Sequence, residues 1–131
     1  MAEPLLSQEI NDPQGYISHA RYFSQPITFS QDVTFQGRKI HTVHTFADAD
    51  ATPSVRSGYL FKTANTGATT ITDFDDGLEG QEILISFNDA NTTITDGGNI
   101  ALSGAFTSTT NDIMRLVKIG STWQEQNRSV N

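Results

Sequence analysis

The chain contains no cysteine, which excludes disulfide bonds and thiolate metal sites. Basic residues are also scarce: Lys and Arg number 8 against 15 Asp and Glu, so the formal net charge is −7. Nucleic acids and anionic membranes bind proteins mainly through Lys and Arg. We therefore expect neither a nucleic-acid partner nor a membrane partner for this acidic chain.

Long apolar runs are missing as well, and none approaches the roughly 20 residues that a membrane-spanning helix needs. The opening residues, MAEPLLSQEIND, lack the basic and apolar regions of a secretory signal peptide. We therefore expect a soluble protein that is made in the cytoplasm of its host cell.

Familiar catalytic motifs are absent too. The sequence has no G-x-S-x-G, no H-E-x-x-H, no Walker-type phosphate loop and no dinucleotide fingerprint. No combination of Ser, His and an acidic residue suggests a nucleophilic triad. We therefore expect a protein that is not an enzyme and that uses no cofactor.

The acidic stretch DFDDGLEGQE, residues 73–82, is a candidate metal site. An EF-hand calcium loop needs D-x-[DN]-x-[DN]-G, whereas Gly77 here follows directly after Asp75 and Asp76. We interpret the stretch as a solvent-exposed hairpin turn. The alternatives are a cation site of two oxygen ligands and a glycosidase carboxylate pair.

His41 and His44 stand three positions apart in HTVH. On a strand such residues point to opposite faces, so they do not converge within one subunit and we expect no metal site. The alternative is a ring of histidines around a threefold axis. The single tryptophan, Trp123, is expected to anchor a core or an interface, with stacking on a sugar as the alternative.

Three parts follow one another along the chain. Apolar residues make up only 36% of it, which predicts a thin core that is completed by burial between subunits. Residues 1–26 hold three of the four prolines and no sustained period, so we expect an extended docking arm. The apolar anchors of this arm are Leu5, Leu6, Ile10, Tyr16, Ile17, Tyr22 and Phe23.

Residues 27–46 change to an alternating pattern. In ITFSQDVTF the apolar side chains fall on one face at period two, and further apolar residues follow in KIHTVHTF. We predict strands here that form a stem at a trimer axis. The expected interface residues are Ile27, Phe29, Val33, Phe35, Ile40, Val43 and Phe46.

Residues 47–131 read as a knob of short strands separated by turn-forming residues. Their spacing of roughly eight to twelve residues, without a helical period, predicts an all-β sandwich or small barrel. The strands are expected at residues 59–63, 69–74, 81–87, 92–95, 99–102, 113–119 and 122–128.

The pentapeptide TTITD occurs twice, starting at Thr69 and at Thr92, and an asparagine stands four places ahead of each copy. No third copy follows, so we do not expect a repeat array. One isoleucine among threonines suits a half-buried strand that ends in an Asp turn. We interpret the copies as two equivalent strands; a threonine-rich ligand surface is the alternative.

The stretch from Gly58 to Ser129, about half the chain, carries recognisable motifs: LFKTANTGATTITDF, then GLEGQEILISFNDANTTITDGGNIALSG, then LVKIGSTWQEQNRS. Gly80 before an apolar strand, NTTI, and the W-x-E-x-x-R-S ending at Ser129 resemble a small β-domain of tailed-bacteriophage virion proteins. That domain is found near the C-termini of tail-fibre and tailspike proteins. The resemblance implies a trimeric tip or knob and says nothing about an active site.

An arm followed by a trimeric β-domain, without a long stem, is also similar to capsid decoration, or cement, proteins. This similarity implies a homotrimer on the capsid surface of a virion, with its arms docked on major capsid subunits. The alternative function is a short tail or head fibre whose knob binds a host-surface glycan.

Overall fold

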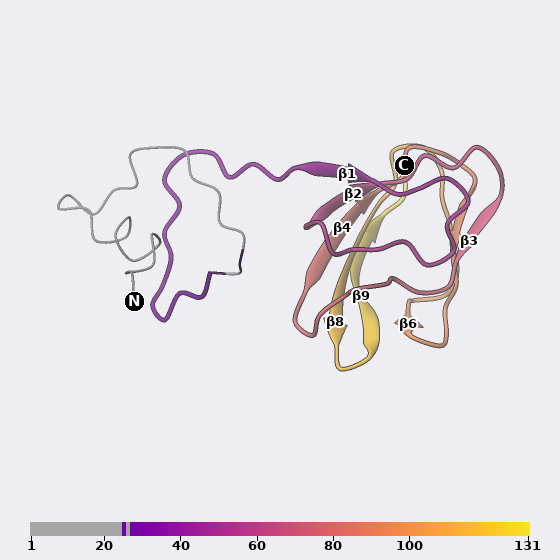
Figure 1. Ribbon diagram of the computed structural model, residues 1–131. Coiled ribbons are helices and arrows are strands. Elements are labelled where there is room, and N and C mark those ends of the chain that lie inside the picture. The colour runs from indigo at the N-terminus through magenta and orange to yellow at the C-terminus, as the bar shows by residue number, and fades with distance from the viewer. Residues whose placement is uncertain (1–24, 26) are drawn as a thin grey trace. The chain divides into compact units, whose positions relative to one another are not determined.

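The computed structural model describes residue 25 and residues 27–131 (Figure 1). The chain divides into two units between Arg38 and Lys39. The described residues contain no helix and nine strands in two sheets, so the all-β fold is confirmed. The seven predicted anchors of the docking arm lie outside the described residues.

All nine strands belong to residues 39–131, and they are short because turn-forming residues interrupt each apolar run. The order is β1-β2-β4-β8-β9-β6 in the six-stranded sheet and β3-β5-β7 in the three-stranded sheet. The strand bounds are β1 Val43–Thr45, β2 Leu60–Lys62, β3 Thr69–Ile71, β4 Glu82–Ser86, β5 Thr92–Ile94, β6 Ile100–Ala101, β7 Phe106–Thr107, β8 Ile113–Ile119 and β9 Thr122–Ser129.

The chain winds between the two sheets. After β2 in the larger sheet it enters β3 in the smaller one, and it then returns to place β4 parallel to β2 and β5 parallel to β3. Leu60 pairs with Leu84, and Thr69 pairs with Thr92. The two TTITD copies are therefore equivalent strands of successive turns, as interpreted, and they lie side by side in register.

The winding ends in an antiparallel hairpin, β8–β9, which Figure 1 shows as the long yellow pair. Its two-residue turn begins at Gly120, whose φ of 60° suits glycine in a tight hairpin turn. Strand β8 pairs with β4 on its other side, and β9 pairs with β6. This hairpin therefore joins the parallel strands to the sheet edge.

The core lies between the sheets. Fourteen apolar side chains are buried there, and Trp123 is fully buried as predicted for a core anchor. Its ring meets the ring of Phe74 edge-on at 5.8 Å between centroids. The thin core predicted from composition is therefore wrong for this part of the chain, which buries a core without a second copy.

The seven strands predicted in the knob are all present, and the sequence pattern missed only the two-residue strand β7. Residues 27–35 form no strand among the described residues, although they alternate. Strand β1 begins at Val43 and belongs to the six-stranded sheet, so the predicted stem boundary at residue 46 lies inside the knob. Residues 73–82 are not a hairpin turn, because β3 and β4 lie in different sheets.

Candidate functional site

The six-stranded sheet has an outer face that no described element covers completely. Val43, Leu60, Leu84 and Arg115 pair in register across four neighbouring strands. Residues that lie directly opposite each other share a face of the sheet. The residues next along these strands, such as Phe61, are buried, so the row from Val43 to Arg115 faces outward.

Apolar side chains dominate the middle of this outer face. Val43 is 52% exposed and Ile113 is 39% exposed, while the other members are half-buried. We call this set the apolar strip: Val43, Leu60, Leu84, Ile113 and Val117. Contiguous exposed apolar surface of this kind marks contact sites in soluble proteins.

Two cations lie on the same face as the apolar strip. Lys62 pairs with Ser86 in the next strand, and Arg115 pairs with Leu84. Arg115 buries its Nε without a hydrogen-bond acceptor among the described residues. One end of the face is polar, because Gln126 donates a hydrogen bond of 3.1 Å to Glu82. The strip is therefore an apolar surface with two cations beside it and one acid, Glu82, opposite Val117.

The predicted interface residues have different environments. Phe29, Val33, Phe35, Ile40 and Val43 are exposed, between 43% and 80% of each side chain. Ile27 is half-buried. Phe46 instead packs inside the knob, where its ring stacks on that of Phe61 at 4.9 Å. It has little surface left for a second copy, so Phe46 is removed from the predicted interface.

The three-stranded sheet presents threonines on its outer face. Thr70 pairs with Thr93, and Thr93 pairs with Thr107 across 3.3 Å between hydroxyl oxygens. Next along the strands, Thr95 donates its hydroxyl to the Ile71 carbonyl oxygen. Threonine here gives β-branched strands with a polar outer side. This arrangement supports the interpretation of the repeat as structural.

Asn65 and Asp89 form a buried polar network at the start of the repeat strands. The Asn65 side chain accepts a hydrogen bond from Ala49 N and donates one to Thr92 Oγ1, at 2.9 and 2.8 Å. Asp89 accepts from Asn65 N and from the Thr92 hydroxyl. Burial raises the pKa of Asp89, but hydrogen bonds from Thr63, Asn65 and Thr92 outweigh it and hold that pKa low. The network fixes one winding turn on the next.

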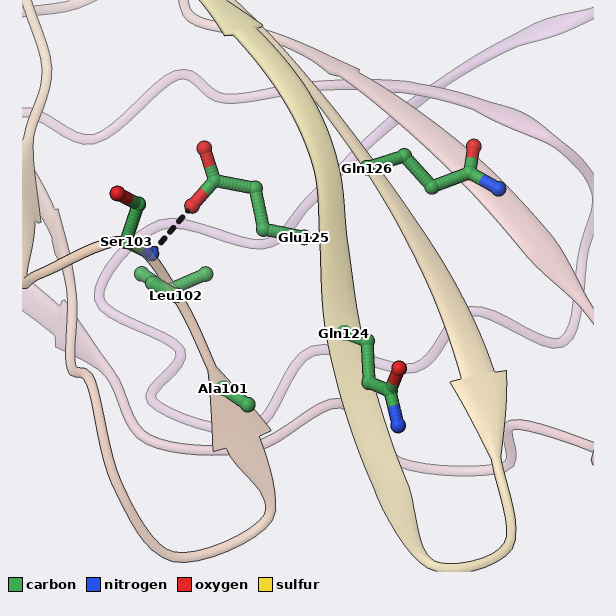
Figure 2. Close-up of a pocket in the computed structure, with 6 residues that line it drawn as sticks. All are labelled: Ala101, Leu102, Ser103, Gln124, Glu125 and Gln126. Carbon is green, nitrogen blue, oxygen red and sulfur yellow. Dashed lines mark hydrogen bonds between the residues drawn. The ribbon is translucent and has the colours of Figure 1, made fainter.

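A shallow hollow of about 430 Å³ lies beside β9 (Figure 2). Figure 2 shows Glu125 directed toward Ser103, whose backbone N–H donates to it at 2.8 Å, and both Gln124 and Gln126 on the other side of the strand. The lining residues are Ala101, Leu102, Ser103, Gln124, Glu125 and Gln126. Amide and hydroxyl groups of this kind can bind a polar ligand.

The carboxylate in this hollow is already engaged. Arg128 forms two hydrogen bonds to Glu125, and they hold the pKa of that carboxyl below its usual range against the effect of burial. The same guanidinium donates to the Gly104 carbonyl oxygen and lies 5.2 Å from the Phe106 ring centroid. Glu125 and Arg128 therefore hold the loop after β6. The sequence pattern W-x-E-x-x-R contained this pair but did not show its role.

The carboxylates of the acidic stretch, residues 73–82, accept hydrogen bonds from different partners. Asp75 accepts from the Thr52 hydroxyl at 3.1 Å, and Asp76 accepts from the Ser54 hydroxyl at 2.6 Å. Asp73 accepts from the Asn99 side chain instead. Within the described part of the chain, no three His, Cys, Asp or Glu residues come together in a way that could hold a metal ion.

Each of the two histidines lies beside an aromatic ring that is in strand β2 or just before it. His41 lies 4.5 Å from Tyr59 and His44 lies 5.7 Å from Phe61, between ring centroids. Each imidazole thus packs on a different aromatic ring instead of converging with the other. In residues 27–131 there is also no helix that is long and apolar enough to cross a membrane.

Comparison with known proteins found no relative of this chain. No protein-family model, no curated protein and no solved structure matches the chain.

Proposed function

We propose that this protein is a structural component of a tailed-bacteriophage virion: a homotrimeric cement, or decoration, protein of the capsid surface. The observation that carries the proposal is the apolar strip on a knob that already has a complete core. A folded unit with spare apolar surface is suited to association with other chains. The resemblance of the knob motifs to trimeric phage β-domains supports the same function.

In this proposal the three parts of the chain have separate tasks. Residues 1–26 dock on major capsid protein subunits, residues 27–46 join the three copies, and the knob faces outward. The protein acts without catalysis and without a cofactor. Three arms on one trimer raise the effective concentration of each arm near the shell, so weak arms together give slow dissociation.

A second candidate function is a short tail or head fibre whose knob binds a host-surface glycan. The hollow beside β9 favours it, because the residues that line the hollow include two amides, Gln124 and Gln126, on one side of the strand and the hydroxyl of Ser103 on the other (Figure 2). Sugars are bound by few, well-placed polar groups in such depressions. The Glu125 carboxylate adds little to this candidate, since Arg128 engages it.

Virions that lack this protein separate the two functions. A ligand that binds only the assembled shell stabilises it by mass action. Under the cement proposal, heads without the protein assemble, rupture at a lower temperature than complete heads and adsorb normally to host cells. Heads of unchanged heat resistance that no longer adsorb would instead establish the fibre function, and a glycan array probed with the purified chain would then identify the sugar.

A further inference from the structure

The connection between β3 and β4 presents one apolar side chain on a fixed turn. Leu78 is 73% exposed, yet its backbone is held by its neighbours. Leu78 N donates to Gln81 Oε1 at 3.0 Å, and Gln81 N donates back to the Leu78 carbonyl oxygen at 3.0 Å. Gly80 N donates to the Lys118 carbonyl oxygen at 2.7 Å. The turn is thus preorganised with its leucine in solvent.

The residue before Leu78 is equally constrained. A Cβ at Gly77 would lie 2.3 Å from Cζ2 of Trp123, so the turn is seated directly on the core. Fixing a contact residue before binding reduces the entropy that association costs. An exposed leucine on a rigid turn therefore has the properties of an interface anchor.

The charges around Leu78 are opposite to those around the apolar strip. Asp75, Asp76 and Glu79 lie within three positions of Leu78, whereas Lys62 and Arg115 lie beside the strip. The one acid on the face of the strip, Glu82, lies opposite Val117 and accepts a hydrogen bond from Gln126. The Glu79 carboxylate is fixed, because it accepts a hydrogen bond from Gly120 N at 3.2 Å. The same chain thus carries an apolar anchor with acidic neighbours in the sequence, and an apolar strip with two cations and one acid on its face. Complementary charge of this kind selects and orients a partner.

We propose that Leu78 of one copy packs on the apolar strip of a second copy, with Asp76 and Glu79 facing Lys62 and Arg115. This inference rests on the homotrimer of the proposed function and assigns the contact to the knob as well as to residues 27–46. The two patches differ, so the contact is heterologous, and such contacts form a closed ring when the rotation between copies closes. In a closed ring of three copies, each Leu78 packs on the apolar strip of the next copy, so every anchor and every strip is in contact.

Sedimentation of the full chain over a range of concentrations tests the contact. Leu78→Ser and Val43→Ser remove the two sides of the apolar contact, and each should raise the concentration at which the trimer dissociates by about tenfold or more. Val130→Ser is the matched control, because Val130 is 65% exposed and lies outside both patches. Fluorescence of Trp123 verifies that each variant is folded.

Charge reversal provides a second, independent measurement. Lys62→Glu should weaken the trimer, and Glu79→Lys added to it should restore association, since the pair is then reversed rather than lost. If the wild type is a trimer and every variant dissociates at the same concentration as the wild type, the proposed contact is wrong, although the trimer itself stands. A folded wild-type monomer at micromolar concentration overturns both. If the variants dissociate but virions lacking the protein keep their heat resistance, the contact holds and the cement function fails.

Discussion

Thr69 and Thr92 stand 23 residues apart in the chain and lie directly opposite each other in parallel strands. Ile71 and Ile94 are paired in the same register, and both are buried. A one-residue slip would move each isoleucine out to solvent, so the register is strongly specified. The repeated pentapeptide is therefore one packing solution used on two successive turns.

The first prediction compares Asn65 and Asn88, which stand four places ahead of the two TTITD copies. Asn65 is buried, whereas Asn88 is exposed. Asn65→Ala should lower the free energy of unfolding by about 2 to 3 kcal/mol, because it leaves Ala49 N and the Thr92 hydroxyl without their buried partner. Asn88→Ala is the matched control. The Asn88 side chain is exposed and accepts only a 3.3 Å hydrogen bond from Ser86, so its loss should cost less than about 0.5 kcal/mol.

Urea unfolding of the two variants measures the difference directly. The Asn65 side chain is 6% exposed, so water cannot easily replace it. Equal losses of stability in the two variants would show that the buried network does not fix the turns.

A second prediction concerns the contact between a turn and the core. Gly77→Ala places a methyl group against the Trp123 ring, and it should lower the free energy of unfolding by about 1 to 3 kcal/mol. Trp123 is the single tryptophan, so its fluorescence reports the displacement of the ring. Gly67→Ala is the control, since a Cβ there meets nothing within 4 Å. If Gly77→Ala is as stable as the control, the turn is not seated on the ring.

Local patterns predicted most of the knob. The strands predicted at 113–119 and 122–128 are separated by a glycine-containing turn, and they form the hairpin β8–β9. The parallel pairing of β2 with β4 was not predictable, because partners 24 residues apart leave no local signal. Residues 27–35 alternate between apolar and polar side chains but form no described strand, since alternation indicates a face and a strand also needs a neighbouring strand to pair with.

Composition was a poor guide to the core. The apolar fraction of 36% predicted a thin hydrophobic core, but five of the eight phenylalanines are among the buried residues. Large aromatic side chains bury much area for few residues. The apolar strip was equally hidden in the sequence: Val43, Leu60 and Leu84 come from separate segments, and only the register of the sheet brings them together.

A third prediction concerns acid stability. Burial raises the pKa of Asp112, but hydrogen bonds from Thr109 and from Asn131 N outweigh it and hold the pKa below its ordinary value near 3.9. The folded state therefore holds this proton less tightly than the unfolded state does. The resulting stability is present above about pH 4 and is lost as the pH falls through the lowered folded-state pKa.

Urea midpoints between pH 7 and pH 2.5 test this prediction. The wild-type midpoint should stay nearly constant down to about pH 5 and then fall. Asp112→Asn should be less stable at pH 7, because it places an amide among three donors, and its midpoint should fall less steeply in acid. An acid slope identical to that of the wild type would show that Asp112 contributes none of the pH dependence.

The last prediction separates folding from docking. In the part of the chain that the structure describes, every residue of the buried core lies between Phe46 and Trp123, so we expect deletion of residues 1–26 to leave this core in place. The shortened chain should unfold at nearly the wild-type temperature and should still associate with itself. Under the cement proposal it should nevertheless fail to bind heads, because a few aromatic and aliphatic anchors usually carry an interface of this kind. Tyr22→Ala combined with Phe23→Ala should weaken binding of the full chain for the same reason. Occupancy on purified heads, compared between the wild type, the deletion and the double substitution, is the measurement. Normal occupancy by the deleted form would assign docking to the knob, and the apolar strip would then be the first surface to test.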